Sequence, residues 1–95
     1  MIGVLTHHWA KKSCVSEARA LLDRNGQAQA KALGFLSRTT LYSINDSTQT
    51  STLVLWDNNE IYDVWKASRE RTNIMDGAER FWSKPPSSER FEVAG

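Results

Sequence analysis

The sequence is poor in the residues that build disulfides, metal clusters and membrane spans. Its 95 residues contain one cysteine, Cys14, which excludes an intrachain disulfide and any CxxC motif for metal or redox chemistry. The apolar runs are only a few residues long, so we expect no segment to cross a membrane. The formal net charge is +1, and such a balanced charge gives no long-range attraction to nucleic acid or anionic lipid.

The start of the chain, MIGVLTHHWAKK, lacks the basic region and the cleavage pattern of a secretory signal. We therefore expect a cytoplasmic protein. A length of 95 residues predicts one domain, residues 1–95, with a thin hydrophobic core. Small domains of this kind often gain stability by dimerising.

What the sequence does contain is an alternation of strand and helix patterns. Strand chemistry is expected at residues 2–9, 35–44, 52–56 and 89–94, and a helical stripe runs from Cys14 towards Gly34. The order β-α-β-β-α-β predicts an α+β, ferredoxin-like fold, with a four-stranded antiparallel sheet and both helices on one face. The other sheet face carries apolar residues, so a second copy of the chain is its expected cover, which gives a homodimeric α/β barrel.

The second half of the chain carries several capping signals. Asp57 and Glu60 fit a capping box at the start of the second helix, and the RERTN segment, 69–73, is expected to fray or break it. Asn73 is expected to begin a further short helix. This helix is expected to end at the KPPSS segment, 84–88, because the residue before a proline avoids the helical conformation.

Three segments carry a resemblance to a known family. They are LGFLSRTTLY (33–42), TLVLWDNNEIYDVWKAS (52–68) and PPSSERFEV (85–93). In these segments the chain resembles the antibiotic biosynthesis monooxygenase (ABM) superfamily of dimeric α/β-barrel proteins. The resemblance implies a homodimer and, in each subunit, a pocket between the sheet and the helices. Some members of that family oxygenate polycyclic phenols or quinols with O2 and without metal or flavin, and some degrade haem.

The resemblance implies a cofactor-independent monooxygenase that acts on an aromatic or quinol-like small molecule. The pocket tryptophan of such enzymes matches Trp65, and their asparagine one turn earlier falls on Ile61, which cannot hydrogen-bond. We expect His7 to be the general base and Arg71 to stabilise an anion, since imidazole can exchange a proton near neutral pH. The predicted substrate contacts are Trp65, Trp56, Ile61 and Phe81.

The two adjacent histidines point to opposite faces of the first strand. His7 shares a face with Leu5 and Trp9, and we expect that face to line the pocket, whereas His8 is expected to face the dimer barrel. No carboxylate or thiolate stands at a ligand spacing from either histidine, so no metal site is predicted. Trp56 is expected in the core, and the sequence leaves Trp65 open between core and pocket.

Three other functions compete with the monooxygenase. A non-catalytic small-molecule-binding or structural dimer of the same fold explains Ile61 without an enzyme. In haem-degrading members the matching positions are His7, Trp65 and Met75, where Met75 stands in place of the axial histidine. An RNA-binding RRM domain shares the element order, but GFLSRTTLY lacks its basic and aromatic motif, so no nucleic acid partner is predicted.

Overall fold

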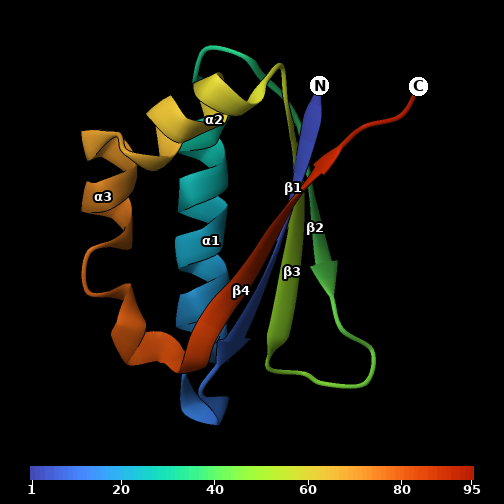
Figure 1. Ribbon diagram of the computed structural model, residues 1–95. Coiled ribbons are helices and arrows are strands. Elements are labelled where there is room, and N and C mark those ends of the chain that lie inside the picture. The colour runs from blue at the N-terminus through green and yellow to red at the C-terminus, as the bar shows by residue number, and fades with distance from the viewer.

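The computed structural model describes all residues, 1–95, and consists of one four-stranded antiparallel sheet covered by helices (Figure 1). The strand order is β2-β3-β1-β4. The strands are β1 (Ile2–Ala10), β2 (Phe35–Tyr42), β3 (Gln49–Trp56) and β4 (Trp82–Glu92). The helices are α1 (Val15–Gln29), α2 (Asn59–Lys66) and α3 (Arg69–Met75), with short 3₁₀ turns η1 (Lys12–Cys14) and η2 (Ala78–Phe81).

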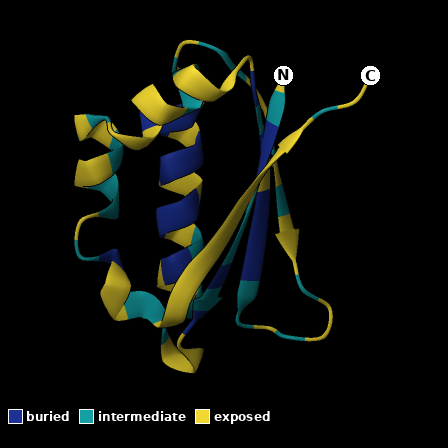
Figure 2. Cartoon of the chain, in the orientation of Figure 1, coloured by how far each residue is buried: buried dark blue, intermediate teal, exposed yellow.

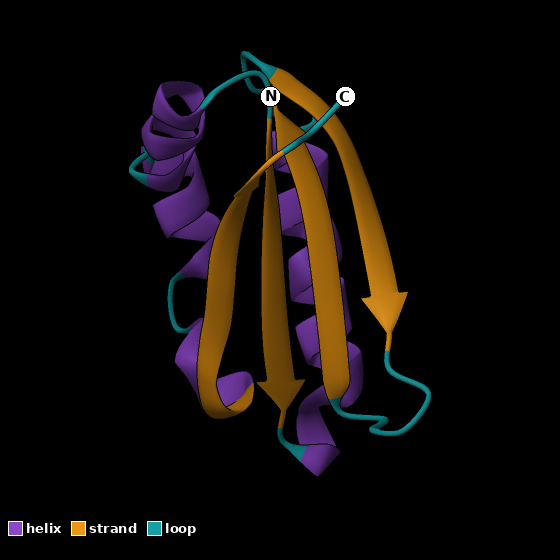
Figure 3. Cartoon of the chain, turned by 45° about the vertical axis from the view of Figure 1, so that its right-hand side comes forward, coloured by secondary structure: helices purple, strands orange, loops and turns teal.

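All helices lie on one face of the sheet, and the opposite face is uncovered (Figure 3). This arrangement confirms the predicted ferredoxin-like α+β fold. The buried residues of α1 form one stripe, visible as dark blue bands in Figure 2, and they pack towards the sheet. Asn25 and Gly26 belong to this stripe, so it is not purely apolar.

The core lies at the end of the sheet where β3 runs into α2. Val4, Ala28, Val54, Trp56 and Trp65 form the buried cluster. The Trp56 side chain has no exposed surface, and its ring stacks on Trp65 with centroids 6.3 Å apart. The prediction that Trp56 belongs to the core is therefore confirmed.

The orientation expected for the histidines of β1 is wrong. Val4 pairs with Val54, so the even-numbered residues of β1 share the helix-covered face with the core. His8 lies on this face and His7 on the uncovered one. The alternation of β1 correctly places the two histidines on opposite faces of the strand. Because both faces carry apolar residues, it does not tell which face the helices cover.

The helix boundaries in the second half also differ from expectation. The cap of α2 is Asn58, whose Oδ1 accepts the Ile61 N–H at 2.9 Å, and Asp57 does not cap. The second helix does break just before RERTN, but RERTN itself is helical and begins α3, which is capped by Ser68. Ser68 has an extended backbone conformation and is the N-cap of α3. The helical pattern of the sequence continues across this position, so it does not reveal that a new helix begins there.

The last strand is longer than predicted, because β4 begins at Trp82 and runs through Pro85 and Pro86. Proline lacks the N–H group that a central strand needs, but it is tolerated at a sheet edge. Here β4 is the edge strand and pairs only with β1, with a register shift near Trp9. Its edge position thus explains why the prolines do not stop it.

No helix of the structure is long and apolar enough to cross a membrane. The uncovered sheet face carries several large apolar side chains at least partly open to solvent. They are Leu5, Leu41, Leu53, Leu55 and Phe91.

Candidate functional site

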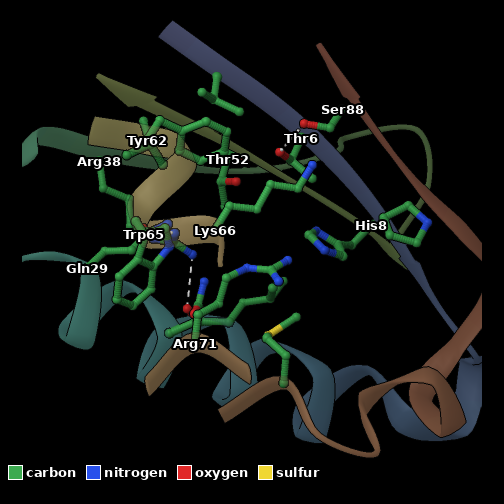
Figure 4. Close-up of a pocket in the computed structure, with 16 residues that line it drawn as sticks. Thr6, His8, Gln29, Arg38, Thr52, Tyr62, Trp65, Lys66, Arg71 and Ser88 are labelled. Atoms are coloured by element: carbon green, nitrogen blue, oxygen red, sulfur yellow. Dashed lines mark hydrogen bonds between the residues drawn. The ribbon is translucent and has the colours of Figure 1, made fainter. Parts of the chain in front are cut away.

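A cavity of about 220 Å³ lies between the helix-covered face of the sheet and the helices. The sheet supplies one wall, with Val4, Thr6, His8, Arg38, Thr52 and Val54. The helices supply the other wall, with Leu22, Asn25, Gln29, Trp65, Lys66 and Arg71. Tyr62, Met75, Pro86 and Ser88 complete the lining, and Figure 4 shows how these side chains converge.

Local structure brings the helical side chains of the cavity into place. Trp65 and Lys66 stand at the end of α2, and Arg71 stands in the first turn of α3. The Ser68 hydroxyl accepts the Arg71 backbone N–H at 3.2 Å, so the cap that begins α3 also positions Arg71. In Figure 4, Lys66 and Arg71 enter the cavity from the helices, while His8 approaches from β1.

The charge of the cavity is one-sided. Arg38, Lys66 and Arg71 line it, and no aspartate or glutamate does. The single salt bridge of the structure lies outside the cavity and joins Arg90 to Asp63 at 2.8 Å. The cavity cations therefore have no carboxylate partner within the chain.

Arg38 is held in place by neutral groups. Its guanidinium donates to Gln29 Oε1 at 2.6 Å and to the Leu22 carbonyl at 2.9 Å. It crosses α1 at Gly26, where an added Cβ would lie 2.5 Å from Arg38 Nε. Burial lowers the pKa of Arg38, and the charge of Asp23 opposes this shift in part. Gly26 is thus required for close packing of a charged side chain against the helix.

His8 is the neutral member of the site. Burial, and then the positive charges of Arg38 and Arg71 and the neighbouring His7, lower its pKa from 6.5 to about 4. The ring therefore carries no charge at pH 7. It is 8% exposed and packs at 4.8 Å from Trp82, and its Nδ1 has no hydrogen-bond partner. Buried polar atoms are normally paired, so this nitrogen is an exception within a ring that lines the cavity.

A second polar group in the cavity wall is also unpaired. Asn25 is 8% exposed, and its Oδ1 accepts no hydrogen bond. Leaving such a group unpaired costs about 1–3 kcal/mol. His8 and Asn25 are thus two residues of the cavity wall whose buried polar atoms have no hydrogen-bond partner within the chain.

The structure brings together only part of the predicted site. Trp65 and Arg71 both line the cavity, and Trp65, 4% exposed, is both a core residue and a cavity wall. His7 lies on the opposite sheet face, where its Nδ1 is 2.6 Å from Ser51 Oγ, so it cannot reach a ligand beside Trp65. The expected meeting of His7, Arg71 and Trp65 does not occur.

The remaining predicted contacts also lie outside the cavity. Trp56 is fully buried behind Trp65, and Phe81 lies in η2, where Arg80 covers its ring at 4.7 Å. Ile61 faces a separate shallow hollow on the outer side of Trp65. The sequence shows that these residues are apolar or aromatic, whereas the packing of the helices on the sheet decides which of them reach the cavity.

The sequence analysis missed His8, Arg38 and Lys66. His8 is expected on the other face, and a lysine on a polar helix face, such as Lys66, is most simply solvated. The signal for Arg38 was weak but present: Gly26 interrupts a helical stripe, which indicates that another group packs closely there.

Comparison with known proteins bears on the fold. No protein-family model matches the chain, and no curated protein matches its sequence. Solved structures do match: a protein of Deinococcus radiodurans, a proposed antibiotic biosynthesis monooxygenase, superimposes with a TM-score of 0.91 at 17% identity, covering 100% of this chain and 94% of that one. The chain has the fold of the antibiotic biosynthesis monooxygenases.

Two further structures with this ABM fold widen the comparison. A proposed antibiotic biosynthesis monooxygenase of Nitrosomonas europaea has a TM-score of 0.89 and 12% identity, with 98% of each chain covered. SnoaB, a cofactor-independent oxygenase from Streptomyces nogalater, has a TM-score of 0.87 and 11% identity, with 99% of this chain and 93% of that one covered. At such identities the similarity establishes the ABM fold, and the chemistry must be argued from the cavity itself.

Proposed function

We propose that the protein is a cofactor-independent monooxygenase of the ABM type that oxidises an aromatic or quinol-like small molecule in the cavity. One observation carries the proposal: the neutral His8 imidazole lines a cavity that is also lined by Trp65 and Tyr62. The aromatic side chains provide flat surface for a ring to pack against. The imidazole provides an acceptor for the proton of a ring hydroxyl.

The proposed reaction begins when the neutral imidazole of His8 accepts the proton of a phenolic hydroxyl. The resulting phenolate is electron-rich, and a ring carbon that carries hydrogen forms a bond to O2. The O–O bond then breaks. One oxygen stays on the ring as a quinone carbonyl, and the other leaves as water with the hydroxyl proton and the ring hydrogen. Arg71 and Lys66 stabilise the negative charge that develops on the phenolate and on the peroxide.

The size of the cavity limits the ligand. Pockets for drug-sized ligands usually measure roughly 300–1,000 Å³, and this one measures about 220 Å³. One or two fused rings are therefore favoured over larger polycycles and over haem. Met75 does line the cavity, as its place in the haem-degrading comparison would require, but the small volume argues against a four-pyrrole macrocycle.

The alternative function is a non-catalytic binding dimer, and Ile61 favours it. In the ABM oxygenases that the sequence resembles, this position is an asparagine, and here it is an apolar residue that faces away from the cavity. Binding without reaction would then be the whole function. The same cavity and the same aromatic ligand class apply to both candidates.

A second copy of the chain is the proposed partner on the uncovered sheet face. Leu5, Leu53 and Phe91 are on that face, and Leu53 is 36% exposed. Burying such side chains between two subunits would stabilise the dimer by roughly 25 cal/mol per Å² of apolar surface. An isolated subunit lacks this stabilisation. Two sheets packed face to face would form the barrel expected from the sequence.

The test uses tryptophan fluorescence and oxygen uptake with 1,4-dihydroxynaphthalene, whose two rings match the cavity. We expect saturable quenching that Trp65→Phe weakens, and enzyme-dependent oxygen uptake that His8→Gln lowers by about 100-fold. His7→Gln is the matched control, because it removes the adjacent imidazole from the other sheet face.

Quenching without oxygen uptake would favour the binding dimer. No quenching by this compound, by simple phenols or by their carboxylated derivatives would refute a planar-ligand site at Trp65.

A further inference from the structure

We propose that the ligand is an aromatic acid, with a carboxylate that binds between Lys66 and Arg71 at the helical wall of the cavity. The proposal rests on the proposed function, since it specifies the class of the aromatic molecule in the same cavity. The carboxylate adds a permanent negative charge to the ligand. Neither the aromatic wall of the cavity nor the general base requires such a charge on the ligand.

The first argument is the unmatched charge. Neither Lys66 Nζ nor the Arg71 guanidinium makes a hydrogen bond or a salt bridge within the chain, although both side chains line the cavity. Arg38 adds a third cation. Like charges gathered around one cavity repel each other, so a bound anion would stabilise the folded protein.

The second argument is that one of these charges, that of Arg38, is partly buried against the helix. Arg38 is held against α1 by Gln29 and the Leu22 carbonyl, and burial lowers its pKa. A cation that only improves solubility would extend into water, where it keeps its hydration shell. The positive field therefore belongs to the interior of the cavity, and its effect is visible at His8, whose neutral form Arg38 and Arg71 favour.

The third argument concerns which anion fits. A phenol ionises near pH 10, so a phenolate is not permanently present at neutral pH. A carboxylate is, and its planar pair of oxygens matches the fork of an arginine side chain. Arg71 offers an unoccupied fork and Lys66 a point charge at the exposed rim, while two donors of Arg38 are already in use.

The remaining polar groups suit the rest of such a molecule. His8 approaches from β1, and the Arg71 side chain extends towards it from the helices (Figure 4). A ring that carries a carboxylate and a hydroxyl can place the first group against the cations and the second against His8. Trp65 and Tyr62 then contact the ring itself.

The experiment compares 1-hydroxy-2-naphthoate with its methyl ester, which has nearly the same shape and lacks the charge. Dissociation constants are measured by tryptophan quenching and by calorimetry at two salt concentrations. We expect the acid to bind at least about tenfold more tightly than the ester. We expect Lys66→Gln and Arg71→Gln each to reduce this preference by about tenfold or more, without weakening binding of the ester.

Arg69→Gln is the matched control. Arg69 is exposed on the same helix as Arg71 and does not line the cavity, so its removal lowers the net charge equally. Ester binding shows that each variant is folded, and Arg71→Lys, which keeps the charge, should retain part of the preference.

Four results would overturn the inference. If acid and ester bind equally, the cavity does not select a carboxylate, and the proposed function stands without it. An equal loss of preference in Arg69→Gln would assign the effect to the overall charge of the protein. Tighter binding of inorganic phosphate than of the acid would identify a different anion. If neither acid nor ester binds, the proposed function fails together with the inference.

Discussion

Replacing His8 with glutamine should change how the stability of the protein depends on pH. The imidazole ionises near pH 6.5 in the unfolded chain, whereas burial and the nearby cations lower its pKa to about 4 in the folded protein. Between these two values the unfolded chain binds a proton that the folded protein does not. The free energy of unfolding therefore falls as the pH falls through this window, and the stability contribution is fully present only above about pH 6.5.

The size of this effect follows from the pKa shift. One pKa unit corresponds to about 1.4 kcal/mol, so lowering the pH from 7 to 4 should cost the folded state about 3 kcal/mol at His8 alone. A glutamine at this position does not titrate. It keeps an amide that can occupy part of the same space between β1 and Trp82. The variant should therefore lose about 3 kcal/mol less than the wild type over the same pH interval.

The assay is urea denaturation at several pH values between 4 and 7.5, followed by circular dichroism. Carboxylates also titrate in this range, but they are common to both proteins, so the difference between the two curves isolates His8. His7→Gln controls for the loss of one imidazole from β1. Parallel pH profiles for wild type and His8→Gln would refute the buried, neutral state of His8 and with it the role proposed for its imidazole.

Three further predictions concern packing, capping and assembly. Gly26→Ala should destabilise the protein although alanine is the better helix former by about 1 kcal/mol, because its Cβ would displace Arg38 from Gln29 and Leu22. Gln27→Ala, at an exposed neighbouring position, is the control. A Gly26→Ala variant more stable than the wild type would contradict the close contact. Asn58→Ala should lower the free energy of unfolding by about 1 kcal/mol through loss of the α2 cap, and Asp57→Ala should change it by less than about 0.5 kcal/mol. If chemical denaturation shows a larger loss of stability for Asp57→Ala than for Asn58→Ala, Asp57 is the cap after all. Leu53→Lys should give a monomer in sedimentation experiments at micromolar concentration while Val64→Lys, on α2, keeps the dimer, and a wild-type monomer would remove the proposed barrel.

Much of the architecture follows from local chemistry that the sequence displays. The alternation of β1, the stripe of α1 and the tryptophan that ends β3 all depend on side-chain periodicity, which requires no knowledge of distant residues. These patterns were enough to predict the ferredoxin-like fold and the burial of Trp56. The ends of α2, α3 and β4 were predicted less well, because Asn58 competes with Asp57 as a cap and because edge strands accept proline.

The candidate site could be predicted only in part, for a different reason. Trp65 and Arg71 could be named from the sequence, but His7 was chosen over His8, because β1 is apolar on both faces and its alternation carries no sign of which face is covered. Only the packing of α1, α2 and α3 on one face of the sheet decided that His8 and Arg38 meet Lys66 and Arg71 in one cavity. Periodicity along the chain determined which residues share a face, and tertiary packing determined which face became the interior.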